Sequence, residues 1–258
     1  MNAPEVLVHR DADALAEAVA ARLVTRLVEV AADRGRVHLS LTGGRIGIHV
    51  LSALAASPSR DSVDWSLVHV WWGDERYVAS ADPDRNEKQA RDALLDHVDL
   101  DPAHVHPMPS LDSGLDVDDA AALYAAELKR ASRPEDHAAV PALDIYLLGM
   151  GPEGHVNSIF PQSAAAHETE RTVVGVRGCP KPPPTRVTMT FPAIRASHEV
   201  WLIESGAEKA EAVHLAVGDA GRLQIPGAGA RGRERTLVLT DEAAASKLPP
   251  DLPRIASP

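Results

Sequence analysis

The chain has one cysteine and no surplus of positive charge, and both shortages exclude classes of function. Cys179 is the only cysteine in 258 residues, so an internal disulfide and a thiolate metal cluster are excluded. The formal net charge is −11 at pH 7 and the basic residues are scattered, which makes a phosphate backbone or an anionic membrane surface a poor partner. The sequence therefore predicts no nucleic-acid binding and no membrane binding.

Long apolar runs and an export signal are lacking as well. No run approaches the roughly 20 apolar residues that a membrane-spanning helix needs. The first residues, "MNAPEVLVHRDADALAEAV", contain no basic stretch followed by an apolar one. Together with the single cysteine, these features lead us to expect a cytoplasmic protein.

Apolar, strand-like runs alternate with amphipathic stretches along the whole chain. We expect strands over residues 5–9, 36–41, 66–72, 142–150, 199–205 and 235–240, and helices over about 11–32, 46–57, 86–98, 206–217 and 241–247. Asn86 is a plausible N-cap of the third of these helices. The alternation is typical of an α/β fold, Rossmann-like and doubly wound, whose mostly parallel sheet is covered by helices on both faces. The Pro-rich stretches predict a small additional lobe or loop excursions, so residues 1–258 are predicted to form a single domain.

The stretch "LSLTGGR" places Thr42, Gly43 and Gly44 between a strand and a helix. Ligands of open parallel sheets bind beyond the carboxyl ends of the strands. Free backbone N–H groups and the helix dipole could therefore face an anion such as a phosphate, or the glycines could simply make a tight turn. The stretch is neither a Walker loop nor a GxGxxG motif.

A second strand end, in "WWGDERYV", carries Asp74, Glu75 and Arg76. Such charges either orient a substrate or a catalytic base, or form an exposed ion-paired turn.

The stretch "GMGPEGHVNSIFP" is the most informative of the strand ends. Its glycines permit an unusual backbone path, and His155 falls where a helix is expected to begin. The dipole of that helix would disfavour the imidazolium form, so a neutral His155 could accept a proton from water. The alternative is a histidine that only caps or packs. With no GxSxG motif nearby, water is a better nucleophile than Ser158, which we expect on a helix face.

Two further basic residues and a histidine pair complete the candidates. Arg186 lies in "PTRVTMTFPAI", and Lys209 lies in the first turn of an expected helix, where an anionic ligand would offset the unfavourable position of a cation. Lys209 could equally be a solvated surface residue. The "HVH" at residues 104–106 lacks a convincing third ligand, so no metal site is predicted.

In this order and at these separations, "LTGG", "WGDERYV" with "DRN", "LLGMGPEGHVNSIFP", "PTRVTMTFPAI" and "GAEKAEAV" resemble the 6-phosphogluconolactonase family. The resemblance spans roughly residues 5–245. It implies hydrolysis of 6-phospho-D-glucono-1,5-lactone to 6-phosphogluconate in the oxidative pentose phosphate pathway, with no metal or organic cofactor. It also implies His155 as the general base, and Asp74 and Arg76 as residues that orient the base or hold the sugar and its carbonyl.

The resemblance implies a phosphate site as well. The Thr42–Gly44 loop, Lys209 and Arg186 would bind the 6-phosphate, and Asn157 is a candidate for a sugar hydroxyl. Two positions depart from the family pattern. Glu153 replaces the usual Asp before the histidine, and Arg45 replaces the usual small residue, where it either adds a phosphate contact or points outward.

Two other functions are weighed against lactone hydrolysis. Glucosamine-6-phosphate isomerases and deaminases carry a catalytic glutamate before the proline of the histidine motif, and Phe160 stands there in this chain. A sugar-phosphate sensor of a transcription regulator would need a DNA-binding module before its first strand, which is expected here by about residue 5. The expected partner is thus a small-molecule substrate, and the protein is expected to be a monomer or a small homo-oligomer.

Overall fold

The computed structural model describes residues 3–136, 138–218, 220–250, 252 and 254–255. Its strands are β1 (Glu5–His9), β2 (Val37–Leu41), β3 (Val68–Trp72), β4 (Asp74–Arg76), β5 (Ile145–Leu148), β6 (Val173–Val176), β7 (Arg186–Met189), β8 (Glu199–Glu204), β9 (Arg235–Asp241) and β10 (Arg254–Ile255). Its α-helices are α1 (Ala12–Arg34), α2 (Arg45–Ala56), α3 (Asn86–Ala93), α4 (Val117–Ala131), α5 (Ala164–His167), α6 (Phe191–Ala196), α7 (Ala210–Val217) and α8 (Pro226–Gly229). Short 3-10 helices are η1 (Pro58–Ser62), η2 (Trp65–Leu67), η3 (Leu95–His97), η4 (Pro102–His104), η5 (Leu111–Ser113), η6 (Pro134–Asp136) and η7 (Ala207–Lys209).

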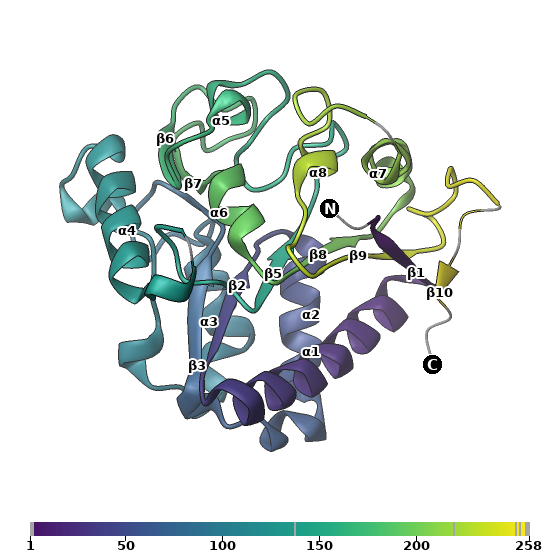
Figure 1. Cartoon of the computed structure of the whole chain (residues 1–258), viewed down its shortest axis with the longest axis horizontal. Helices are drawn as coiled ribbons and strands as arrows, with labels where there is room; N and C mark the ends of the chain where they lie inside the picture. Colours follow the sequence, from purple (N-terminus) through teal and green to yellow (C-terminus); the bar gives the residue numbers. More distant parts are fainter. Residues whose placement is uncertain (1–2, 137, 219, 251, 253, 256–258) are drawn as a thin grey trace.

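A seven-stranded sheet in the order β10-β1-β9-β8-β5-β2-β3 forms the centre of the molecule, and its neighbouring strands are paired in parallel. The central strands are continuous apolar runs because both of their faces are covered. One face packs against α1, α2 and α3, and the other against α4, α6 and α7. Figure 1 shows α1 and α2 together on one side of the sheet, with α6 on the other. The predicted doubly wound α/β fold is confirmed.

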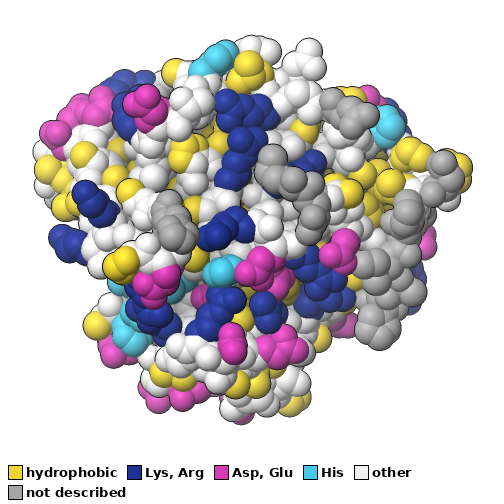
Figure 2. Space-filling view, viewed as in Figure 1, with side chains coloured by type: hydrophobic (Ala, Val, Ile, Leu, Met, Phe, Trp, Pro, Cys, Tyr) yellow, Lys and Arg dark blue, Asp and Glu magenta, His cyan; other side chains and the backbone are white. Residues whose placement is uncertain are grey.

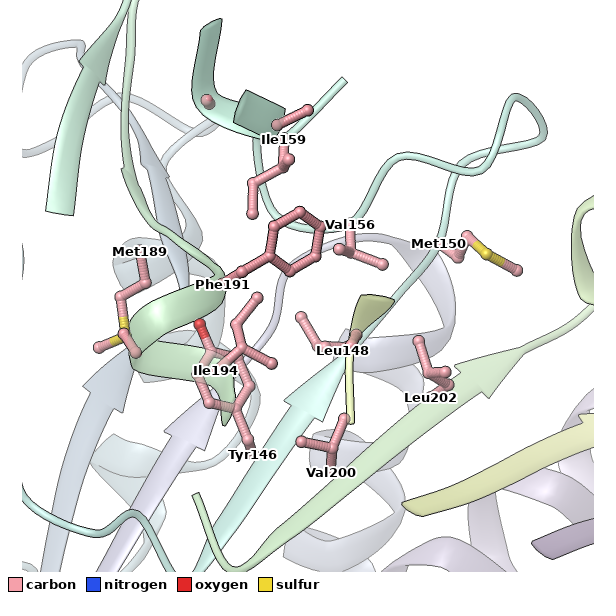
Figure 3. Close-up of a cluster of buried hydrophobic side chains, with 14 of the residues drawn as sticks. Tyr146, Leu148, Met150, Val156, Ile159, Met189, Phe191, Ile194, Val200 and Leu202 are labelled. Atoms are coloured by element: carbon pink, nitrogen blue, oxygen red, sulfur yellow. The ribbon is translucent and has the colours of Figure 1, made fainter. Parts of the chain in front are cut away.

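The additional lobe is a three-stranded antiparallel sheet in the order β4-β7-β6. Val187 and Met189 of β7 belong to the same buried cluster as Tyr146 and Leu148 of β5. Figure 3 shows this cluster around Phe191, with β5 leading directly into it. The shared core ties the lobe to the main sheet. That residues 1–258 form a single domain stays a prediction.

Three local predictions are wrong. The helix expected over about 241–247 is not formed, since residues 242–247 form turns. Asn86 is the first residue of α3 rather than its cap, and Arg85 holds the cap position without a capping side-chain hydrogen bond. No helix begins at His155; this segment is a loop with isolated bridges at Val156, and α5 begins only at Ala164.

Candidate active site

A cavity of about 740 Å³ lies at the carboxyl ends of β2, β3, β5 and β8. Every site residue predicted from the sequence lines it: Thr42, Gly43, Gly44, Arg45, Asp74, Arg76, His155, Asn157, Arg186 and Lys209. Figure 2 shows Lys and Arg side chains gathered over the middle of one face, around a histidine and several acidic groups. The topology thus brings together residues that lie up to 167 positions apart, although their individual roles remain predictions.

The backbone around His155 is folded tightly by glycine. The N–H of Gly151 donates to the carbonyl of His155 at 2.8 Å, and Gly154 adopts a φ of 89° that other residues rarely reach. A Cβ at Gly151 would lie 1.9 Å from Nδ1 of His155. Glycine at position 151 is therefore required for the imidazole to lie where it does.

The protonation of His155 is set by its neighbours. Its Nδ1 lies 2.9 Å from Oε1 of Glu153, and because a carboxylate only accepts, Nδ1 carries the proton and Nε2 keeps a lone pair. The ring stacks on Phe160 at 4.3 Å between centroids, and the side chain is only 15% exposed. Burial lowers the pKa of His155 to about 4, against the opposing effect of Glu153. This lowered pKa favours the neutral ring expected from the sequence, with burial rather than a helix dipole as its cause.

Asp74 is held from two sides in the interior. Its Oδ2 accepts a hydrogen bond from the hydroxyl of Ser158 at 2.6 Å, and its Oδ1 lies 3.4 Å from Nδ2 of Asn86. All three residues are buried. The prediction that Ser158 lies on a helix face is therefore wrong. Ser158 lies in a loop, and its hydroxyl fixes the carboxylate of Asp74.

Glu75 fastens β4 to α3. Its carboxylate accepts the backbone N–H groups of Arg76, Asn86 and Glu87, so it satisfies donors in the first turn of α3. Burial raises the pKa of Glu75 to about 7, opposed by the charge of Arg85. The Arg76 guanidinium donates to the carbonyl of Asp84 beside the cavity. Asp74 and Glu75 are buried, so the alternative of an exposed ion-paired turn at the end of β3 is wrong.

The predicted phosphate loop combines an uncapped helix with close packing. Gly44 precedes α2 with a φ of 84° and no side-chain cap, and Oγ1 of Thr42 accepts from the N–H of Gly149 at 3.2 Å. A Cβ at Gly43 would lie 1.9 Å from Oδ1 of Asn86, so only glycine fits there. The Arg45 side chain is 91% exposed and pairs with Glu208 at 3.1 Å. Arg45 therefore lies at the rim of the cavity.

Lys209 and the buried carboxylate of Glu204 bind the two backbone polar groups of the same residue, Met150. Glu204 ends β8, is 1% exposed and accepts the N–H of Met150 at 2.5 Å, while Lys209 donates to the carbonyl of Met150. Burial raises the pKa of Glu204, and the charge of Lys209 opposes the rise. The pair fixes the start of the loop that carries His155.

The side chains of Arg186 and Asn157 already make several hydrogen bonds within the protein, which the sequence did not indicate. The guanidinium of Arg186 donates to the carbonyls of Lys181, Pro182 and Pro183 at 3.1–3.2 Å, and its Nη1 lies 3.8 Å from Oδ2 of Asp74. Nδ2 of Asn157 donates to the hydroxyl of Tyr146 at 2.9 Å. Each therefore has only part of its hydrogen-bonding capacity left for a ligand.

The sequence did not identify three residues that line the cavity, Asn86, Lys181 and Glu204. It also placed Ser158, which contacts Asp74 from the interior, on a helix face. Glu204 is the final residue of an apolar strand, a position that points to the carboxyl edge of the sheet and could have identified it. The other three depend on long-range packing that leaves no local pattern.

A model of the family described as glucosamine-6-phosphate isomerases/6-phosphogluconolactonase matches residues 10–239. The chain belongs to this family. It is 56% identical to the 6-phosphogluconolactonase of Streptomyces coelicolor over 253 residues, which cover 97% of each chain. It is 50% identical to the 6-phosphogluconolactonase of Mycobacterium tuberculosis, over 93% of this chain and 96% of that one. The solved structure of 6-phosphogluconolactonase from Trypanosoma brucei superimposes with a TM-score of 0.81 at 25% identity, covering 95% of this chain and 99% of that one.

The two histidines of "HVH" both pack against His69, and none of the three lines this cavity. The rings of His69 and His104 lie 3.8 Å apart, and Nδ1 of His106 lies 2.7 Å from Oε1 of Glu127. Within the described part of the chain, no group of three or more His, Cys, Asp or Glu is arranged to hold a metal ion. Over the same residues, no helix is both long and apolar enough to cross a membrane.

Proposed function

We propose that the protein hydrolyses 6-phospho-D-glucono-1,5-lactone to 6-phospho-D-gluconate, the lactonase step of the oxidative pentose phosphate pathway. The observation that carries this proposal is the neutral His155, buried at a cavity rich in basic side chains in a protein of net charge −11. A sugar phosphate supplies the anion that these cations would bind. Identity above 49% to three full-length bacterial 6-phosphogluconolactonases supports the same substrate.

The proposed reaction needs one base and no covalent intermediate. Nε2 of His155 removes a proton from water while the water oxygen attacks the lactone carbonyl, which becomes a tetrahedral oxyanion. The bond between the carbonyl carbon and the ring oxygen then breaks. The ring oxygen takes the proton from Nε2, and the new carboxylic acid ionises in water. Arg76 is proposed to stabilise the oxyanion or to hold the sugar, and Asp74 is proposed to orient the base or to hold the sugar and its carbonyl.

The 6-phosphate is proposed to bind at the Thr42–Gly44 loop and Lys209, with Arg186 lending charge through its remaining donors. Asn157 is proposed to contact a sugar hydroxyl, and Arg45 to add charge at the rim. Anchoring the phosphate brings the carbonyl of the substrate to His155. A cytoplasmic location, a monomer or small homo-oligomer and the absence of nucleic-acid partners remain expectations from composition.

Amino-sugar isomerisation or deamination is not favoured. In this chain the position before Pro161 is Phe160, whose ring stacks on His155 and offers no carboxylate for proton transfer. The test is to supply freshly made 6-phosphogluconolactone and glucosamine 6-phosphate separately to the protein, each against a control without enzyme. The proposal expects loss of the lactone well above its spontaneous rate and no turnover of the amino sugar. Lactone loss at the spontaneous rate alone contradicts it.

A further inference from the structure

Lys181 is a cavity residue that stands next to the catalytic machinery without touching His155. Its Nζ lies 3.1 Å from both Oε1 and Oε2 of Glu153. Glu153 in turn lies 2.9 Å from Nδ1 of His155 through Oε1. Lys181, Glu153 and His155 thus form a chain of three interacting groups. Lys181 comes from the loop before β7, and the other two come from the loop after β5.

The loop that carries Lys181 is fixed in place by Arg186. The guanidinium of Arg186 donates hydrogen bonds to three carbonyls of the loop, those of Lys181, Pro182 and Pro183. The N–H of Cys179 also donates to the carbonyl of Pro184 at 2.9 Å. Lys181 is therefore presented to Glu153 from a defined backbone rather than from a loose surface loop.

Glu153 needs such a partner because of its length and exposure. Its side chain is 35% exposed and has one more torsion than an aspartate, so alone it would adopt several rotamers in water. The ammonium group of Lys181 favours the rotamer that also reaches His155. The proposed function assigns His155 as the base, and this inference rests on that assignment. We propose that Lys181 is a positioning residue, which holds the Glu153 carboxylate against Nδ1 of His155 and thereby orients the imidazole for proton transfer.

The charged groups around His155 give the proposal a directional test. Glu153 and Asp74 favour the imidazolium form, whereas Lys181 disfavours it, and Phe160 contributes only an apolar face. Removing only the charge of Lys181 would raise the pKa of His155, whereas releasing Glu153 from His155 would lower it. A lysine that acts only through its charge therefore gives an upward shift when it is removed, whereas for a lysine that positions Glu153 the loss of the carboxylate opposes that shift.

The experiment compares Lys181→Met with Lys181→Arg, which keeps the charge, and with Lys247→Met, which breaks the surface pair of Lys247 with Glu211 at 2.8 Å. Because the Lys181 pair is partly exposed, we expect Lys181→Met to lower kcat about three- to tenfold, with KM changed less than about twofold. Lys181→Arg is expected to keep at least half of the activity, and Lys247→Met all of it. In Lys181→Met, the acidic limb of kcat/KM is expected not to move to higher pH, because the released Glu153 no longer raises the pKa of His155.

A second background tests the route through Glu153. Glu153→Asp withdraws the carboxylate from Lys181 by one methylene, so Lys181→Met is expected to have a smaller effect on kcat in that background than in the wild type. Full additivity of the two substitutions would overturn the proposal. A rise in KM with unchanged kcat would also overturn it, because Lys181 would then act as a substrate contact.

Failure of the proposed function is distinguishable from failure of this inference. If the wild type does not hydrolyse the lactone, the proposed function is wrong. NMR of His155 in the free protein still reports whether its Nδ1 contacts Glu153. A change in the Nδ1–H resonance of His155 in Lys181→Met, absent in Lys181→Arg, then supports the link, because it reports the loss of the Glu153 contact. An unchanged Nδ1–H resonance in Lys181→Met overturns it.

Discussion

Titration of the His155 imidazole by NMR tests how the protein prepares its proposed base. Burial lowers the pKa of His155 from 6.5 to about 4, which corresponds to about 3 kcal/mol in favour of the neutral ring. At pH 5 an ordinary histidine would be about 3% neutral, whereas a ring with a pKa of about 4 is about 90% neutral. The difference in the population of competent base is about thirtyfold.

The assay is a ¹⁵N titration of the free protein between pH 5 and 8, with His155→Gln used to assign the resonance. Free protein is used because a substrate phosphate titrates near pH 6 and would obscure the imidazole. We expect one tautomer, protonated at Nδ1, throughout this range. Glu153→Gln keeps an acceptor for Nδ1 but removes a charge that raises the pKa, so the ring should become still harder to protonate. A midpoint near 6.5 in the wild type, or a higher midpoint in Glu153→Gln, would refute the reasoning.

Three further outcomes follow from contacts of buried groups. Gly43→Ala would place a Cβ 1.9 Å from Oδ1 of Asn86, so we expect KM to rise about tenfold or more, with partial recovery in the Gly43→Ala, Asn86→Ala double variant measured by the same assay. Ser158→Ala removes the 2.6 Å hydrogen bond to Asp74 and should lower the free energy of unfolding by about 1–3 kcal/mol in urea titrations; an unchanged midpoint would contradict this. Burial lowers the pKa of His38 to about 2, so as the pH falls the imidazole is protonated in the unfolded chain before it is protonated in the folded protein. The folded state therefore loses stability below about pH 6.5, by about 1.4 kcal/mol at pH 5.5. His38→Asn should flatten the dependence of Tm on pH between 7.5 and 5.5, and an unaltered slope would contradict the assignment.

The main sheet could be predicted from the sequence because its strands are buried on both faces. Continuous apolar runs such as that of β8 cannot be mistaken for half-exposed strands, and glycine or charged residues mark where each run ends. The order of these strand ends along the chain was enough to gather the ten predicted residues around one cavity. Parallel topology does the rest, since it puts all carboxyl ends on one edge.

The lobe and its contacts could not be predicted in the same way. The strands β4, β6 and β7 have three or four residues each and follow turns or a Pro-rich loop, so their pairing depends on the partner strand rather than on a local pattern. The contact of Ser158 with Asp74 spans 84 positions of sequence, and that of Lys181 with Glu153 spans 28. The expected helix at His155 failed for a related reason: glycines that permit a helix start also permit the tight loop that buries the imidazole.

The most direct test of the account is the rate of 6-phosphogluconolactone hydrolysis by the wild type and by His155→Gln, each corrected for spontaneous hydrolysis in buffer. We expect kcat to fall about 100-fold or more in His155→Gln, the size expected for a lost general base, with KM within about threefold of the wild type and an unchanged Tm. Equal rates for the two proteins would contradict the assignment of His155, and wild-type protein no faster than buffer would contradict the lactonase function itself.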